Sequence, residues 1–348
     1  LRMDRRARRF ASIRLTGIVV NIALNLVFVL ALRMSIVAVF TANLLSSLVT
    51  TLLVIPSAVR DIRPHIEGTL ARAMLAFGLP TVPAGIASML MQVVDRPLMQ
   101  RLAGDAAAGI YGANYRLGIF MMLVVTMFQY AWQPFALQSA DLPEARRIFA
   151  RVLTYFALVG SLVTVSVALF IDDVATVPLF HGHALIGNAY QEGLRIVPII
   201  LFAYLWTGFT AILNAGILIE KRTGYLALIT VAGAAVNIAA NLLLIPRLGY
   251  TGGALATFAA YLTTAVLAWF VGRKIFPVPW EYGRVGKILS AVGIIAALWY
   301  AGIGPAALPG PVWEAVLLAG FIALLFLFRV FLPSELRELR SLLRRAPL

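Results

Sequence analysis

Long runs of apolar residues, separated by short stretches that hold most of the charges, repeat along almost the whole chain. Each run is long enough to cross a hydrocarbon core of roughly 30 Å, which requires about 20 helical residues. We mark ten such runs: residues 10–33, 35–58, 72–94, 104–136, 144–170, 187–218, 222–246, 248–275, 284–303 and 311–332. Because the runs are continuous rather than alternating, they exclude a β-barrel. The pattern predicts an all-α polytopic membrane protein with about ten transmembrane helices.

Two segments have nearly the same sequence at an offset of 236 − 20 = 216 residues. Val20–Leu26 reads VNIALNL and Val236–Leu242 reads VNIAANL, with six of seven residues identical. The second copy, 222–275, follows four predicted spans, whereas the first copy, 10–58, follows none. Internal repeats in membrane proteins are typical of transporters, with the substrate site between the halves. We therefore expect a parallel internal repeat and a partial two-lobe exporter fold that lacks its first four helices.

The repeat divides the chain into four predicted parts. Residues 1–60 would be the last two helices of an N-terminal lobe, and 61–276 a six-helix C-terminal lobe. Residues 277–333 would be two additional helices. Residues 334–348 place their leucines on one face and predict a cytoplasmic amphipathic tail, with a solvated basic tail as the alternative.

Composition and charge agree with a membrane protein. The chain is 61% hydrophobic and only 13% charged, against about 25% charged in soluble domains. Of the 29 basic residues, 23 lie on one set of alternating loops and helix ends and 6 on the other set. By the positive-inside rule, both termini are expected in the cytoplasm of a bacterium, with the spans in its cytoplasmic (inner) membrane. The net charge of +14 is thus explained by topology rather than by nucleic-acid binding.

The residue types that bind metals and carry redox chemistry are scarce. The chain has no Cys and three His, which excludes disulfides and thiolate sites and offers no zinc spacing. We expect no metal, no cofactor and no catalytic residues.

Arg116 is the most informative single residue, because it lies about three turns inside an apolar span. A buried charge in a membrane usually faces a cavity or a partner, and Arg suits phosphate geometry. The alternative is that Arg116 snorkels outward or pairs with Asp95 or Asp105. Three further residues are grouped with it as substrate-binding candidates, with packing or surface exposure as their alternatives: Arg195, Asn114 and Gln92.

Other residues are candidates for structure or gating. Pro80 and Pro83 should kink or break the span 72–94, either as a bending helix or as a static kink. Asp95 and Arg96 are interpreted as a solvated ion pair at the outer end of that span.

Two asparagine pairs recur in the repeat, each with its members four residues apart on one helix face: Asn21 with Asn25, and Asn237 with Asn241. Asparagine can hydrogen-bond between membrane helices, so this interpretation is favoured over substrate contact.

Several segments in order resemble one family of membrane proteins. These are Gly78-Leu79-Pro80 with Pro83, Asp95-Arg96 before Gly109-Ile110-Tyr111, Tyr115-Arg116, Ala131-Trp132-Gln133-Pro134-Phe135, and Asn237 through Thr257. Together they resemble the polysaccharide-transporter branch of the multidrug/oligosaccharidyl-lipid/polysaccharide exporter superfamily, which contains O-antigen (lipopolysaccharide) and capsule-unit flippases.

The resemblance implies a flippase that moves a polyprenyl-pyrophosphate-linked oligosaccharide across the bacterial cytoplasmic membrane by alternating access. Arg116, with Arg195, would then hold the pyrophosphate while the lipid tail stays among membrane lipids. A polysaccharide polymerase and glycosyltransferases are the protein partners implied. Two alternatives stay open: a cation-coupled multidrug exporter, which would want a carboxylate within a lobe, and a membrane glycosyltransferase or polymerase.

Overall fold

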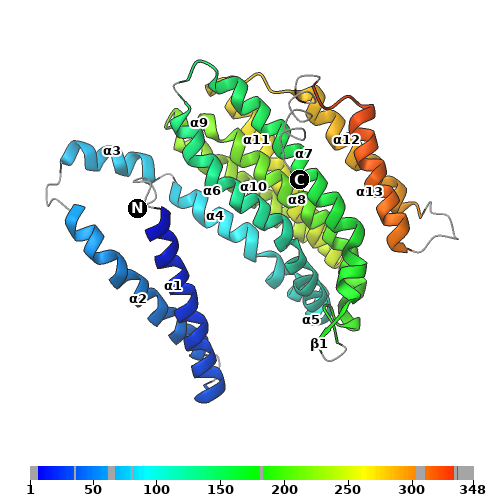
Figure 1. The fold of residues 1–348 in the computed structure, drawn as a ribbon, viewed down its shortest axis with the longest axis horizontal. Helices are drawn as coiled ribbons and strands as arrows, with labels where there is room; N and C mark the ends of the chain where they lie inside the picture. The colour runs from blue at the N-terminus through cyan, green and yellow to red at the C-terminus, as the bar shows by residue number, and fades with distance from the viewer. Residues whose placement is uncertain are drawn as a thin grey trace, which may run out of the picture. The chain divides into compact units, whose positions relative to one another are not determined.

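A computed structural model describes residues 7–34, 37–61, 67–79, 81–140, 142–180, 183–302, 310–332 and 335. Nearly all of them are helical (Figure 1). The first part of the chain contains α1 (Ala7–Leu26), η1 (Val27–Ala31), α2 (Val37–Asp61), α3 (Gly68–Gly78), α4 (Thr81–Val93), α5 (Asp95–Tyr115), η2 (Arg116–Gly118) and α6 (Ile119–Gln138).

The rest of the chain contains α7 (Ala145–Thr176), β1 (Pro178–Phe180), β2 (His183–Ala184), η3 (Asn188–Ile196), α8 (Val197–Leu213), α9 (Ala215–Ile219), α10 (Thr223–Leu248), α11 (Tyr250–Ile275), α12 (Tyr282–Tyr300) and α13 (Gly310–Leu327). The two short strands pair antiparallel. The chain separates into two compact units, Leu1–Ala71 and Arg72–Leu348, which are described in turn.

The predicted membrane-spanning pattern is confirmed. In the described part of the chain, nine helical segments are long and apolar enough to cross a membrane. Eight match single predicted spans, and the ninth, Gly68–Gln138, contains two predicted spans in 71 residues. The protein is therefore a multi-pass helical membrane protein. The division into lobes stays a prediction, and the predicted tail lies outside the described residues except for Glu335.

The first unit is built around the pair α1 and α2. The Asn21 Nδ2 donates to Asn43 Oδ1 at 2.8 Å, and the Ser46 hydroxyl donates to the Gly17 carbonyl at 2.7 Å. Gly17 is required at this crossing, because a Cβ there would lie 2.5 Å from the Thr50 methyl group. Small residues let membrane helices approach closely enough for such polar contacts.

The internal repeat is visible in the hydrogen bonds of the two asparagine pairs. In α1 the Asn25 Nδ2 donates to the Asn21 carbonyl at 2.9 Å and to its Oδ1 at 3.1 Å. In α10 the Asn241 Nδ2 donates to the same two atoms of Asn237, at 2.9 and 3.3 Å. The two copies therefore share local structure as well as sequence.

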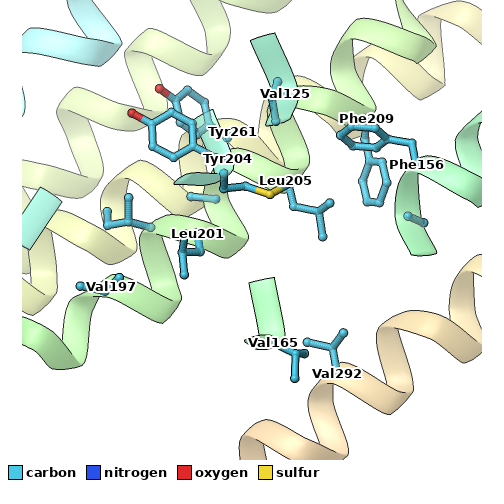
Figure 2. Packing of buried hydrophobic residues seen from close by; sticks show 14 of the residues in the cluster. Val125, Phe156, Val165, Val197, Leu201, Tyr204, Leu205, Phe209, Tyr261 and Val292 are labelled. Carbon is cyan, nitrogen blue, oxygen red and sulfur yellow. The ribbon is translucent and has the colours of Figure 1, made fainter. Parts of the chain in front are cut away.

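The second unit is a bundle whose centre is α8, packed between α7 and α11. Its inward positions are Ile200, Leu201 and Leu205, none of which is exposed. Figure 2 shows Phe156 of α7 against Phe209 of α8, with ring centroids 5.8 Å apart. Helices α12 and α13 lie beside α7 along one side of this bundle (Figure 1). This packing gives the unit a large apolar core, and Ile217, Ile229 and Ala268 form a second, smaller cluster.

A direct connection joins α4 to α5. Helix α4 ends at Val93, which agrees with the predicted end of the span at 94, and α5 follows at Asp95. Backbone hydrogen bonds continue across this connection, with Leu98 N donating to Val94 O at 3.2 Å. Within α5 the helical geometry is broken at Gly104, whose φ of 88° and ψ of 171° suit a residue without a Cβ. Residues 95–103, which lie between two predicted spans, are therefore helical as well.

An ion cluster fastens the segment after α13 to the bundle. Arg284 on α12 donates to Glu281 Oε2 at 2.9 Å, to the Val330 carbonyl at 2.8 Å and to both oxygens of Glu335 at 3.0 and 2.8 Å. Tyr155 on α7 donates to Glu335 Oε1 at 2.7 Å. The cluster thus joins α7, α12 and the end of the α13 segment.

The cluster makes stability depend on pH through Glu335. Burial raises the pKa of Glu335, but hydrogen bonds from Leu332 N–H, Tyr155 and Arg284 outweigh it and lower the pKa below its ordinary value of 4.5. A lowered folded-state pKa stabilises the fold above the ordinary value, and this contribution is lost as the pH falls through the folded pKa.

We expect Glu335→Gln to lower the free energy of unfolding at neutral pH by on the order of 1 kcal/mol. The melting temperature should fall with it. The substitution should also flatten the fall in melting temperature as the pH drops below about 5. Melting of the detergent-purified chain measures both. The exposed Glu220→Gln is the control, and a pH profile of Glu335→Gln that equals wild type would contradict the assignment.

Candidate functional site

Among the described residues, Asp95 is the carboxylate that is fully buried in the second unit, where α5 meets α10 and α11. Asp95 is only 2% exposed, and it lies in a helical segment that is predominantly apolar. Its position follows from the helix continuing past residue 94, because the next turn then packs against α10 rather than leaving the bundle. An ionisable side chain at such a place is a functional candidate by default.

Three neutral side chains donate hydrogen bonds to this carboxylate. The Asn241 Nδ2 lies 2.7 Å from Asp95 Oδ1, and the hydroxyl groups of Thr257 and Tyr111 lie 2.7 and 3.0 Å from Oδ2. Within the described residues, no Lys, Arg or His lies within the 4.0 Å of an ion pair with Asp95. Hydrogen bonds satisfy the oxygens but leave the negative charge uncompensated.

The surroundings of Asp95 can compensate that charge with a proton or a small cation. Asn241 Oδ1 is buried and has no hydrogen-bond partner in the described part of the chain. The side-chain oxygens of Asn237 and Thr257 lie in the same cluster. Hard cations prefer oxygen ligands, and one carboxylate balances one positive charge. The cluster of Asp95, Asn237, Asn241 and Thr257 is therefore a candidate site for a proton or a hard monovalent cation.

The solvated Asp95–Arg96 ion pair predicted from the sequence was wrong. Successive residues on a helix point in different directions, so Asp95 faces inward while Arg96 is exposed. The Arg96 guanidinium instead lies 5.9 Å from the centroid of the Tyr115 ring. This is a cation–π contact, which leaves the guanidinium donors available.

A group of buried tyrosines extends from Asp95 into the bundle, and sequence reasoning missed its role. Tyr111 and Tyr115 have ring centroids 5.4 Å apart, and the Tyr204 hydroxyl donates to the Tyr115 hydroxyl at 3.2 Å. Figure 2 shows the hydroxyl groups of Tyr204 and Tyr261 on the same side of their rings. The four-residue spacing of Tyr111 and Tyr115 was the available signal, since it places both on one helix face.

Arg116 lies where α5 passes into α6 through the short 3₁₀ segment η2. Its side chain is exposed, while the neighbouring Tyr115 and Leu117 are buried. In the described residues the guanidinium makes no hydrogen bond or ion pair, and it does not pair with Asp95 or Asp105. A 3₁₀ stretch within a helix often marks a hinge. The structure thus presents an unpaired Arg at an irregular point of an apolar span.

The other three substrate-binding candidates are not gathered around Arg116 in a common network. Arg195 is exposed, donates to the Tyr250 hydroxyl and lies 4.8 Å from that ring centroid. Asn114 is buried and donates to the Ile110 and Tyr190 carbonyls at 2.9 and 2.8 Å. Gln92 is exposed and reaches only the Ser88 carbonyl, at 3.4 Å. Their proposed contacts with substrate stay predictions.

The proline candidates flank a real helix break. Helix α3 ends at Gly78 and α4 begins at Thr81, while Pro80 itself lies outside the described residues. Pro83 falls in the first turn of α4, where a missing N–H costs no helical hydrogen bond. Pro83 therefore fits the start of a new helix rather than a kink within one.

The asparagine pairs differ in their surroundings. Asn237 and Asn241 are fully buried, and Asn241 bonds to Asp95. Asn21 and Asn25 are half-buried, and Asn21 bonds to Asn43 across α1 and α2. Both pairs thus connect helices, and the second pair also contributes to the carboxylate cluster.

Comparison with known proteins gives a family and a fold. The family model described as "Polysaccharide biosynthesis protein" matches residues 1–182, which is more than half of the chain. No curated protein sequence matches the chain significantly.

Two solved structures share the fold. An outward-facing multidrug resistance MATE family transporter of the MOP superfamily aligns with a TM-score of 0.60 and 13% identity, over 74% of this chain and 60% of that one. The lipid II flippase MurJ, in an inward closed conformation, aligns with a TM-score of 0.59 and 14% identity, over 90% and 65%. This chain spans less than two thirds of the length of either structure. At such identities the similarity shows the fold alone.

The carboxylate cluster generates a direct test. We expect Na⁺, at constant ionic strength, or protons to raise the melting temperature of the purified chain, because a ligand that binds only the folded state stabilises it. Asp95→Asn keeps the shape but removes the charge, so it should abolish the response to Na⁺ and change the response to pH, of which the Glu335 contribution remains.

Asp105→Asn is the matched control, because Asp105 is exposed and bonds only to Gln100 in the described residues. A melting temperature of Asp95→Asn that still responds to Na⁺ and pH as in wild type would eliminate the cluster as a cation or proton site.

Proposed function

This chain belongs to the polysaccharide biosynthesis protein family and has the fold of MOP-superfamily exporters, and from this we propose that it acts as a flippase. Its substrate would be a polyprenyl-pyrophosphate-linked oligosaccharide used to build a surface polysaccharide. It would move this lipid from the inner to the outer leaflet of the bacterial cytoplasmic membrane. The protein would thus be a transporter and not an enzyme.

The observation that carries this proposal is the exposed, unpaired Arg116 within an apolar helical segment. A guanidinium binds phosphate oxygens with two parallel hydrogen bonds, so a diphosphate compensates its charge where water is scarce. The lipid tail would stay in the membrane, along the apolar outer surface of the helices. Gln92 on α4 and Arg96 at the start of α5 are further exposed polar residues.

Asp95 supplies a means of coupling in this proposal. Only a ligand that binds two conformations with different affinity can shift the equilibrium between them. Tyr111 donates to Asp95 and lies after the Gly104 break, on the part of α5 that leads to Arg116, so cation or proton binding at the buried cluster would change the position of the exposed arginine. The ion gradient would then drive the return of the empty transporter.

The burial of Asp95 also supports a second candidate function. A cation-coupled multidrug exporter requires a carboxylate within a lobe, and we expected acidic residues only at loops and helix ends. The burial of Asp95 removes that objection. Ion-dependent efflux of an organic cation would support this candidate, whereas the family membership and Arg116 favour an anionic lipid. A glycosyltransferase remains the least favoured alternative, because no acid–base pair lies beside the arginine among the described residues.

Arg116→Ala should lower affinity for the diphosphate lipid about tenfold or more, because it removes charge-assisted hydrogen bonds. In cells that depend on the gene encoding this chain, lipid-linked units should accumulate on the cytoplasmic leaflet and surface polysaccharide should fall. Arg116→Lys should restore only part of the activity.

Arg101→Ala provides the control, because Arg101 is an exposed arginine on the same segment, beside the Gly104 turn. The variants must first be shown to insert in equal amounts. Normal surface polysaccharide in Arg116→Ala cells would refute the role of this arginine.

A further inference from the structure

A cavity of about 450 Å³ in the second unit differs in chemistry from the others, and nothing above assigns it. Two cavities beside α12, of about 350 and 300 Å³, are bordered almost entirely by apolar side chains. Half of the residues that line the larger cavity are also aliphatic, but the other half are three amide side chains, a hydroxyl and two aromatic rings. We call it the amide pocket, after Gln129, Gln133 and Asn214, with Thr81, Phe77 and Trp132.

The three amides are not used by the protein. Within the described residues, the side chains of Gln129 and Gln133 make no hydrogen bond, and Asn214 Oδ1 is buried without a partner. Gln129 and Gln133 are four residues apart on α6 and therefore share one helix face. Gln129 is half-buried and Gln133 exposed, so the cost of an unpaired polar atom falls on the buried Asn214 Oδ1, which a polar ligand or water would satisfy.

The other residues that line the pocket indicate the chemical class of this ligand. None of the described residues that line the pocket is charged, which disfavours a phosphate or an ammonium group. Each amide can both donate and accept, which matches neighbouring hydroxyl groups. Trp132 is held by stacking on Phe128 and by a bond to the Ala211 carbonyl at 3.3 Å. Phe77, 40% exposed, adds an apolar face against which C–H groups can pack.

The pocket lies across the break between α3 and α4. Phe77 is just before the break and Thr81 just after it, and the Thr223 hydroxyl donates to the Phe77 carbonyl at 2.9 Å. Helix α3 contains no buried residue, so little packing fixes its direction. A ligand that contacts Phe77 on α3 and the amides on α6 would favour one arrangement of the break.

We propose that the amide pocket binds a neutral sugar ring of the lipid-linked oligosaccharide, separately from the diphosphate at Arg116, which rests on the proposed function. Its volume lies within the range of small-molecule sites, about 300–1,000 Å³. The pocket would therefore select the glycan, while the arginine recognises the part common to all such lipids. Sugar binding would also hold α3 and α4 in one relative position.

The test uses the full chain in lipid nanodiscs and two probes: a neutral oligosaccharide released from the cell's own surface polysaccharide, and inorganic pyrophosphate. Saturation-transfer NMR should detect saturable binding of the oligosaccharide to wild type. Gln129→Leu with Gln133→Leu should weaken it about tenfold, as expected for the loss of several neutral hydrogen bonds. Gln133→Leu alone, at an exposed position, should weaken it less.

Gln138→Leu is the matched control, because Gln138 is exposed on the same helix but does not line the pocket. Arg116→Ala should leave oligosaccharide binding unchanged and affect only the pyrophosphate probe. No saturable binding to wild type, or equal binding by the double variant, would overturn the sugar site. The effect of Arg116→Ala on surface polysaccharide would still test the proposed function, so the two failures can be told apart.

Discussion

The central constraint on this protein is that the polar side chains buried between its helices have no water around them. Each buried polar group must find a partner within the bundle, and the Asp95 carboxylate finds three neutral donors but no positive charge among the described residues. Its donors come from α5, α10 and α11, which are separated in sequence by up to 162 residues. The same constraint explains the paired asparagines, which bond to each other's backbone and side chain as well as across helices.

Much of the fold could be predicted from the sequence because the membrane simplifies the problem. An apolar run of about 20 residues has few structures available to it, so the ten spans followed from length and hydropathy. The repeat, visible in VNIALNL and VNIAANL, also predicted equivalent helices, and the asparagine pairs of α1 and α10 make equivalent hydrogen bonds. These features depend on local composition and do not require knowledge of distant contacts.

The candidate site was predicted less well, for a physical reason. Arg116 was found because a charge within an apolar run is conspicuous. Asp95 was misplaced because the short polar stretch around it resembles a loop. In the structure this stretch is helical as far as the break at Gly104. Thr257 and Tyr111 are ordinary residues for a membrane helix. Their role arises from tertiary packing, which no local pattern records, and the amide pocket has the same origin.

The cluster around Arg284 has a consequence for how motion in this protein could be observed. Because it joins α7, α12 and the end of the α13 segment, it acts as a mechanical coupling between the core bundle and its peripheral helices. A spectroscopic label on the outer face of α13 would then report rotation of the whole bundle without touching any residue that meets substrate. The peripheral helices α12 and α13 would thus move with the bundle, so the label would follow its motion during the transport cycle.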